Sequence, residues 1–111
     1  MNRAQIQALV LAAGMGTRMK SKLPKVLHQL GGKPLLWHVL HTLDEAGITR
    51  RAVVVGHGKE KVQAQFPREE HWFNQEQQLG TAHAVLMAKD FLAQSEGYVF
   101  ILCGDAPLIR P

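Results

Sequence analysis

Short apolar runs alternate with longer amphipathic segments along this chain of 111 residues, and this order restricts the fold more than any other feature. Continuous apolar runs at 8–12, 52–55 and 98–103 are typical of strands buried on both faces of a sheet. Residues 71–74 are a shorter strand candidate. Because a segment with helical character separates each strand candidate from the next, the sequence predicts an α/β fold.

Three segments have the pattern of helices. The first lies between Pro34, which suits the start of a helix, and Gly47, which suits its end. A weaker helix is predicted at 59–65 and a stronger one, with a clear apolar stripe, at 81–92. Strands that alternate with helices run parallel and are joined by right-handed crossovers. We therefore predict a mostly parallel sheet with flanking helices, in one domain without linker or repeat.

The carboxyl ends of the predicted strands carry the most distinctive loops of the sequence. In open parallel sheets, ligands bind beyond these ends of the strands. Residues 13–25, 75–81 and 104–107 all follow predicted strands, so the alternation places the three loops at one edge. The sequence therefore predicts a ligand site at this edge.

The charge of the chain favours an anionic ligand. Thirteen Lys and Arg residues against nine Asp and Glu residues give a formal net charge of +4. Nucleotides, phosphorylated sugars and nucleic acid would all suit such a chain. The basic residues form no long run and are not interleaved with aromatic residues, which argues against nucleic acid. No apolar stretch reaches the ~18 residues of a membrane-spanning helix, so we expect no membrane partner.

Two features bear on the cellular compartment. The first residues, MNRAQIQALVLAAG, superficially resemble a signal peptide, but Gln5 and Gln7 interrupt the apolar run and a glycine loop follows it. The single cysteine, Cys103, excludes an internal disulfide framework and favours a cytoplasmic protein. Because Cys103 stands inside the apolar run at 98–103, we predict a buried, unreactive thiol.

The loop after the first strand, AAGMGTRMKSKLPK at 12–25, has the composition of a phosphate-binding loop. Its glycines let backbone N–H groups approach phosphate oxygens, Arg18 offers a bidentate fork, and Lys25 offers a point charge. Met19 stands where a dinucleotide-binding fingerprint needs its third glycine, and the Gly-Lys-Ser/Thr of a P-loop is missing. A hydride-transfer enzyme and a P-loop ATPase are therefore disfavoured.

Three ordered motifs resemble the signature of the sugar-phosphate nucleotidyltransferases: LAAGMGTRMKSKLPKVLHQLGGKPLL at 11–36, QQLGTAHAV at 77–85 and CGDAPL at 103–108. The combination is most similar to the pyrophosphorylase half of the bacterial bifunctional UDP-N-acetylglucosamine pyrophosphorylase/glucosamine-1-phosphate acetyltransferases. The resemblance implies a Rossmann-like nucleotidyltransferase fold and Mg²⁺ as cofactor. It implies a reaction in which UTP and N-acetylglucosamine 1-phosphate form UDP-N-acetylglucosamine and pyrophosphate. UDP-N-acetylglucosamine is used in cell-wall and lipopolysaccharide synthesis.

The resemblance also implies roles for individual residues. Arg18 and Lys25 would face the phosphates and act in catalysis, and Asp105 would bind the metal. Gln75 would read the uracil, because its amide carries both a donor and an acceptor. The nucleotide would be held by Lys25, by the backbone of Leu11, Ala12, Ala13 and Gly14, and, near the base and ribose, by Gly80 and Thr81.

The family's nucleotidyltransferase domain is longer than this chain, so the resemblance assigns residues 1–111 to its N-terminal, nucleotide-binding portion. We expect this portion alone to lack useful pyrophosphorylase activity. Two alternatives remain open: a nucleotide-binding module without turnover, and a related enzyme with another nucleotide or sugar, such as a cytidylyl- or guanylyltransferase. A sheet that ends with the strand at 98–103 would leave an apolar edge unpaired, which predicts self-association.

Overall fold

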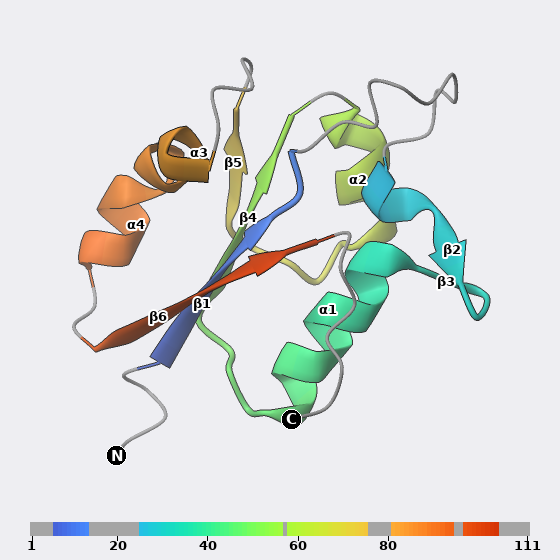
Figure 1. The fold of residues 1–111 in the computed structure, drawn as a ribbon, viewed down its shortest axis with the longest axis horizontal. Helices are drawn as coiled ribbons and strands as arrows, with labels where there is room; N and C mark the ends of the chain where they lie inside the picture. The colour runs from blue at the N-terminus through green and yellow to red at the C-terminus, as the bar shows by residue number, and fades with distance from the viewer. Residues whose placement is uncertain (1–5, 14–24, 57, 76–80, 95–96, 105–111) are drawn as a thin grey trace.

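A parallel four-stranded sheet lies at the centre of the computed structural model, which describes residues 6–13, 25–56, 58–75, 81–94 and 97–104. The strand order is β5–β4–β1–β6, and each neighbouring pair is parallel (Figure 1). The strands are Ile6–Leu11 (β1), Arg51–Val55 (β4), Trp72–Asn74 (β5) and Tyr98–Cys103 (β6). The predicted fold class and the four predicted strands are confirmed.

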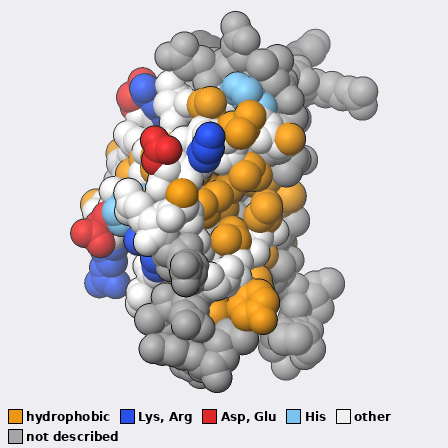
Figure 2. Space-filling model, turned by 90° about the vertical axis from the view of Figure 1, so that its left-hand side faces the viewer, with side chains coloured by type: hydrophobic (Ala, Val, Ile, Leu, Met, Phe, Trp, Pro, Cys, Tyr) orange, Lys and Arg blue, Asp and Glu red, His pale blue; other side chains and the backbone are white. Residues whose placement is uncertain are grey.

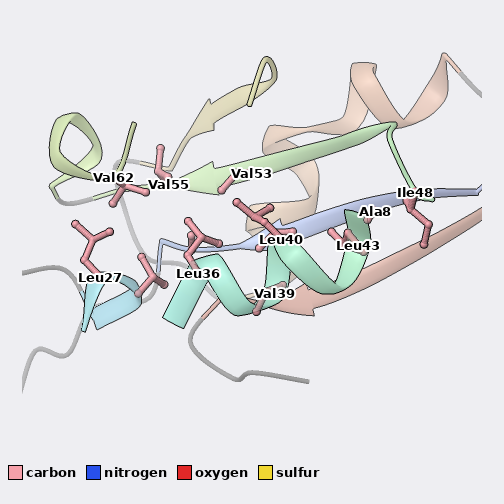
Figure 3. Packing of buried hydrophobic residues seen from close by; sticks show 13 residues of the cluster. Ala8, Leu27, Leu36, Val39, Leu40, Leu43, Ile48, Val53, Val55 and Val62 are labelled. Carbon is pink, nitrogen blue, oxygen red and sulfur yellow. The ribbon is translucent and has the colours of Figure 1, made fainter. Parts of the chain in front are cut away.

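Helices cover both faces of this sheet (Figure 1). Successive strand residues point to opposite faces. Ala8 and Val10 of β1 therefore join one apolar cluster, and Leu9 joins another. The first cluster lies under α1 (Leu35–Glu45) and α2 (Lys59–Gln65), and the second under α3 (Thr81–Met87) and α4 (Lys89–Ala93). The first cluster (Figure 3) comprises Ala8, Val10, Ala12, Val26, Leu27, Leu36, Val39, Leu40, Leu43, Ile48, Val53, Val55 and Val62.

The start of α1 differs by one residue from the prediction. Pro34 is extended, with φ −57° and ψ 150°, and pairs with Gln29 in a small hairpin of β2 (Gln29–Leu30) and β3 (Lys33–Pro34). Gly31 and Gly32 both have positive φ, which is the conformation that a two-residue hairpin turn requires. The sequence analysis missed this hairpin, although Gly-Gly between two short segments is a recognised hairpin signal. The predicted end of the helix at Gly47 is confirmed, because Gly47 has φ 76°.

The prediction of one continuous helix over 81–92 is wrong. The helix is broken at Ala88, which has φ −106° and ψ 15° and whose N–H donates to the carbonyl of Val85 over 3.1 Å. Ala88 is fully buried against the sheet, between the buried side chains of Ala84 and Phe91. The tighter turn changes the direction of the chain, so that α3 and α4 both pack on the same apolar cluster.

The edge strand β6 exposes apolar side chains on both of its faces. Tyr98, Phe100 and Ile101 are each about half exposed, and Figure 2 shows hydrophobic side chains gathered on the side of the molecule that carries α3, α4 and the start of β6. The predicted burial of Cys103 is wrong, because Cys103 belongs to this edge strand and is exposed. None of the described helices is long and apolar enough to cross a membrane.

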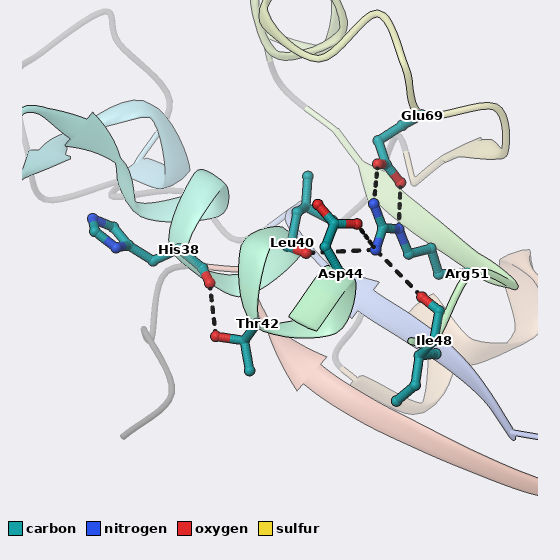
Figure 4. A network of polar contacts seen from close by, with 7 residues as sticks. All are labelled: His38, Leu40, Thr42, Asp44, Ile48, Arg51 and Glu69. Carbon is teal, nitrogen blue, oxygen red and sulfur yellow. Dashed lines mark hydrogen bonds and ion pairs between the residues drawn. The ribbon is translucent and has the colours of Figure 1, made fainter. Parts of the chain in front are cut away.

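A buried arginine connects α1 to the segment before β5 (Figure 4). The guanidinium of Arg51, at the start of β4, lies 2.7 Å and 3.0 Å from the two carboxylate oxygens of Glu69 and 2.7 Å from a carboxylate oxygen of Asp44. Arg51 also donates to the carbonyl oxygens of Leu40 and Ile48. The side chains of Arg51 and Glu69 are only 11% and 8% exposed, so neighbouring residues cover most of this ion pair.

Candidate nucleotide-binding site

The carboxyl ends of β1, β4 and β5 approach one another closely at one edge of the sheet. Gly56 follows β4 directly, and a Cβ placed on it would lie 2.8 Å from the carbonyl oxygen of Gln75 and 3.3 Å from the Cβ of Ala13. Gln75 follows β5, and its backbone N–H donates to the carbonyl of Val55 over 2.7 Å. These three strand ends therefore meet only because residue 56 has no side chain.

The end of β6 completes the same edge. The N–H of Gly104 donates to the carbonyl of Leu11 over 2.9 Å, and a Cβ on Gly104 would lie 3.3 Å from both that oxygen and the Cβ of Ala12. Ala12 and Ala13 are each 5% exposed. Because small residues follow β1, β4 and β6, a ligand can approach the backbone along this edge.

The predicted phosphate-binding loop leaves and re-enters the core next to this edge. It begins after Ala13 and returns at the short 3₁₀ helix η2 (Lys25–Leu27). Val26 and Leu27 are almost fully buried in the first cluster, and Figure 3 shows Leu27 at the same end of that cluster as Val55 and Val62. Buried residues thus fix both ends of the loop, and the backbone of Lys25 is held beside the carboxyl ends of the strands.

Gln75 is one of only two polar residues that are buried in the described part of the chain. It is 4% exposed, and its side-chain Nε2 lies 2.9 Å from Nδ1 of His83 on α3. Burying an amide is favourable only where it is hydrogen-bonded. The site therefore holds a polar, hydrogen-bonding group in a fixed place between β5 and α3.

The structure brings together the predicted site residues that it describes. Leu11, Ala12, Ala13 and Gln75 lie at the same edge, which the sequence predicted. Lys25 and Thr81 lie in η2 and at the start of α3, and their side chains lie outside the described part. Four further predicted residues lie outside the described residues: Gly14, Arg18, Gly80 and Asp105.

Two residues at this edge were missed by the sequence analysis. Gly56 directly follows the strand predicted at 52–55, and His83 lies inside the helix predicted at 81–92. The close approach at Gly56 could have been predicted, because a glycine at the end of a buried strand often marks a place where another backbone lies close. The contact of His83 could not, because its partner Gln75 is eight residues away in the sequence and belongs to a different element.

We expect Gly56→Ala to lower the free energy of unfolding by about 1–3 kcal/mol, because an added methyl group would overlap a backbone oxygen that no rotamer change can move. Gly104→Ala is the matched control. Its added Cβ would have contacts no shorter than 3.3 Å, one of them to the flexible end of Leu36. Urea denaturation of the two variants measures the difference. A Gly56→Ala protein as stable as the parent would contradict the close approach of β4 and β5.

A separate cavity of about 410 Å³ lies away from this edge, between α1 and the segment after α2. Trp37, Phe66 and Arg68 line it together with the Arg51 ion pairs. Among the described residues, none that is predicted to bind nucleotide lines this cavity, so the candidate site is assigned to the carboxyl edge.

Comparison with known proteins finds relatives that match most of this chain. A protein described as "Bifunctional protein GlmU" from Bacillus cytotoxicus is 53% identical over 102 residues, which are 92% of this chain and 22% of the relative. The protein of the same description from Staphylococcus epidermidis is 49% identical over 105 residues, which are 95% of this chain and 23% of the relative. The chain thus spans about a fifth of the length of these curated relatives, and corresponds to their N-terminal region.

Solved structures share the fold. The inositol-1-phosphate CTP transferase from T. maritima superposes with a TM-score of 0.71 at 28% identity, over 89% of this chain and 43% of that one. A nucleotidyl transferase from Methanothermobacter thermautotroptrophicus superposes with a TM-score of 0.76 at 22% identity, over 96% of this chain and 53% of that one. Residues 8–111, which include most of β1, the other three strands and the edge just described, match the MobA-like NTP transferase domain, and the chain belongs to that family of nucleotidyltransferases.

Proposed function

We propose that this chain supplies the nucleotide-binding part of an enzyme that transfers a uridylyl group from UTP to N-acetylglucosamine 1-phosphate. The observation that carries the proposal is the buried amide of Gln75 at an edge of the sheet that is otherwise lined by small residues. The identity of about 50% to proteins described as GlmU supports the same reaction. We also propose a cytoplasmic location, where nucleoside triphosphates and sugar phosphates are found.

In the proposed reaction, a phosphate oxygen of the sugar phosphate attacks the α-phosphorus of UTP. The bond between the α-phosphorus and the bridging oxygen breaks, and pyrophosphate leaves. Transfers of this kind depend mainly on positioning and on neutralisation of charge, so no protein nucleophile is required. Arg18 and Lys25 would pair with phosphate oxygens, and the backbone from Leu11 to Gly14 would hold the nucleotide.

Asp105 would hold Mg²⁺ in this proposal. A carboxylate is the type of ligand that Mg²⁺ favours, and Asp105 directly follows Gly104, which is hydrogen-bonded to the end of β1. When bound, the ion would neutralise charge on the phosphates. The residues of this chain that act around it would be Arg18 and Lys25.

Calorimetry with UTP, CTP, GTP and ATP, each with and without Mg²⁺, tests the nucleotide preference. We expect the chain to bind UTP more tightly than the other three. Gln75→Ala should weaken UTP binding by about 1–3 kcal/mol without loss of the fold, because the uracil edge loses a hydrogen-bonding partner. Circular dichroism of the variant controls for folding. Equal affinity of the parent chain for all four nucleotides would reject the proposal.

A cytidylyltransferase is the second candidate, and one observation favours it. The T. maritima structure, whose description names a CTP transferase, is 28% identical and shares the fold over most of this chain. The same calorimetry separates the two candidates, because the second requires CTP to bind more tightly than UTP.

Self-association through β6 is a further part of the proposal. Its side chains carry no charge and most are exposed, and among the described strands it pairs only with β1. Exposed edge strands pair readily with other strands. We expect light scattering to give a mass above that of the 12.3 kDa monomer. Ile101→Lys places a charge on the edge and should shift the mass toward the monomer, whereas Ala64→Lys, on α2, should not. A monodisperse monomeric parent would contradict this part.

A further inference from the structure

We infer that His38 is a positioning residue for the phosphate-binding loop, because it joins to α1 the hairpin that follows Lys25. The inference rests on the proposed function, in which Lys25 pairs with phosphate oxygens. Lys25 opens η2, which is followed by the hairpin of β2 and β3 and then by α1. The inference therefore gives a role to a histidine and a hairpin that the reaction proposed above does not use.

The contact of His38 with the hairpin has a defined direction. Its Nε2 lies 2.7 Å from the backbone oxygen of Leu30. A carbonyl oxygen accepts hydrogen bonds and has no proton to donate, so Nε2 is the donor and carries a proton. The imidazolium and the neutral tautomer with its proton on Nε2 both make this bond. Figure 4 shows the side chain of His38 pointing away from the ion pairs of Arg51.

The hairpin is not held in place by burial of its own side chains. Both residues of β2 are exposed, Leu30 to 53%, and a Cβ added to Gly31 or Gly32 in the turn would meet nothing within 4 Å. A two-stranded hairpin alone has little stability in water. The position of this hairpin therefore depends on the polar contacts that join it to α1.

These contacts lie at the base of the hairpin and beside its turn. At the base, the N–H of Leu35 donates to the carbonyl of His28 over 2.8 Å. Nearer the turn, Nζ of Lys33 lies 5.3 Å from the centre of the Trp37 ring, which is a cation–π contact made by a long, exposed side chain. The bond from His38 instead joins a backbone atom to a short side chain of a packed helix, so it restricts the hairpin more closely.

The hairpin in turn orients η2. Val26 and Leu27 are buried and fix where η2 lies on the core, but two adjacent anchors leave a single 3₁₀ turn free to rotate about the line between them. A third anchor away from that line removes this freedom, and β2 begins two residues after η2 ends. Because a misplacement of about 1 Å can cost a catalytic group most of its effect, the backbone direction at Lys25 matters for phosphate binding.

The test uses the 111-residue chain and measures by calorimetry its affinity for UTP and for inorganic tripolyphosphate, each with Mg²⁺. His38→Phe keeps an aromatic ring and removes the donor, whereas His38→Gln keeps a donor at a similar distance from the backbone. His41→Phe is the matched control, one turn further along α1. We expect His38→Phe to weaken binding of both ligands roughly three- to tenfold, a part of the effect of one hydrogen bond to a charged group. His38→Gln should keep most of the affinity, and His41→Phe should leave it unchanged.

A double-mutant cycle with Lys25→Ala distinguishes positioning from a general loss of structure. If His38 acts through Lys25, His38→Phe should weaken binding in the parent chain and should weaken it no further in Lys25→Ala. Equal losses in the two backgrounds would overturn the inference, and so would unchanged affinity in His38→Phe where Lys25→Ala binds more weakly. If tripolyphosphate shows the expected pattern and UTP binds no more tightly than other nucleotides, the proposed function fails and the inference stands.

A second measurement does not depend on any ligand. Nitrogen-15 NMR of the imidazole should show a proton on Nε2 of His38. In His38→Phe, the N–H of Leu35 should exchange with solvent faster than in the parent chain, because the hairpin opens more often. A parent chain without a proton on this Nε2, or unchanged exchange at Leu35 in the variant, would overturn the inference whatever the binding measurements give.

Discussion

Replacing Arg51 with Met should lower the free energy of unfolding by about 3–5 kcal/mol, which is a large part of the total stability of a domain of this size. The cost arises from Glu69 rather than from the lost contacts of Arg51 alone. The side chain of Glu69 is 8% exposed, and without the guanidinium its carboxylate would remain buried without an opposite charge. Urea denaturation followed by circular dichroism measures the effect.

Two further variants separate the buried pair from the exposed one. Asp44 also contacts Arg51 at 2.7 Å, but its side chain is 60% exposed, so Asp44→Asn should cost no more than about 1 kcal/mol. The double variant Arg51→Met/Glu69→Leu removes both buried charges and should recover much of the stability that Arg51→Met loses. Arg68→Met is the exposed control. A loss below about 1 kcal/mol in Arg51→Met would show that the pair is solvated.

The contribution of Arg51 should not vary with pH in the neutral range. Burial alone would lower the pKa of Arg51, but its hydrogen bonds and charge interactions with Glu69 and Asp44 outweigh burial and raise the pKa. A group whose pKa is higher in the folded state than in the unfolded state stabilises the fold. This stabilisation is fully present at any pH below the unfolded-state pKa, and it is lost as the pH rises through the folded-state pKa. Because both values are strongly alkaline, Arg51 stays protonated, and the effect of Arg51→Met should be equal at neutral and mildly alkaline pH.

Replacing Arg18 with Ala should lower kcat by roughly 10²–10³, the usual effect of removing one group that stabilises charge in a transition state. Turnover is measured in a chimera that joins residues 1–111 to the remaining part of the Bacillus cytotoxicus relative. The Michaelis constant for UTP should change less than kcat, because the fork of Arg18 is proposed to act on charge that develops during transfer.

Lys22→Ala is the matched control for this prediction, because Lys22 lies in the same loop and carries the same charge, and we expect it to be solvated. Lys25→Ala should resemble Arg18→Ala, and Asp105→Asn should raise the concentration of Mg²⁺ needed for turnover. Turnover equal to the parent in Arg18→Ala, Lys25→Ala and Asp105→Asn together would show that these residues do not form the site.

The strands, the fold class and the edge of the sheet that carries the candidate site could be predicted from the sequence. The runs at 8–12, 52–55 and 98–103 identify strands because a buried strand must be apolar along its own length. The alternation with helices then fixes the direction of the strands, and with it the edge where Ala13, Gln75 and Gly104 meet. Each of these features depends on neighbours in the sequence, so a local pattern is sufficient to predict it.

The tertiary structure alone decided the features that depend on distant neighbours. Ala88 breaks its helix because the sheet beneath it must be covered by both α3 and α4, and Cys103 is exposed because its strand lies at the edge. Arg51 meets Glu69 across 18 residues, and Gln75 meets His83 across eight. Burial and hydrogen bonding of these side chains are set by which elements pack together in space, and no periodicity along the chain records that packing.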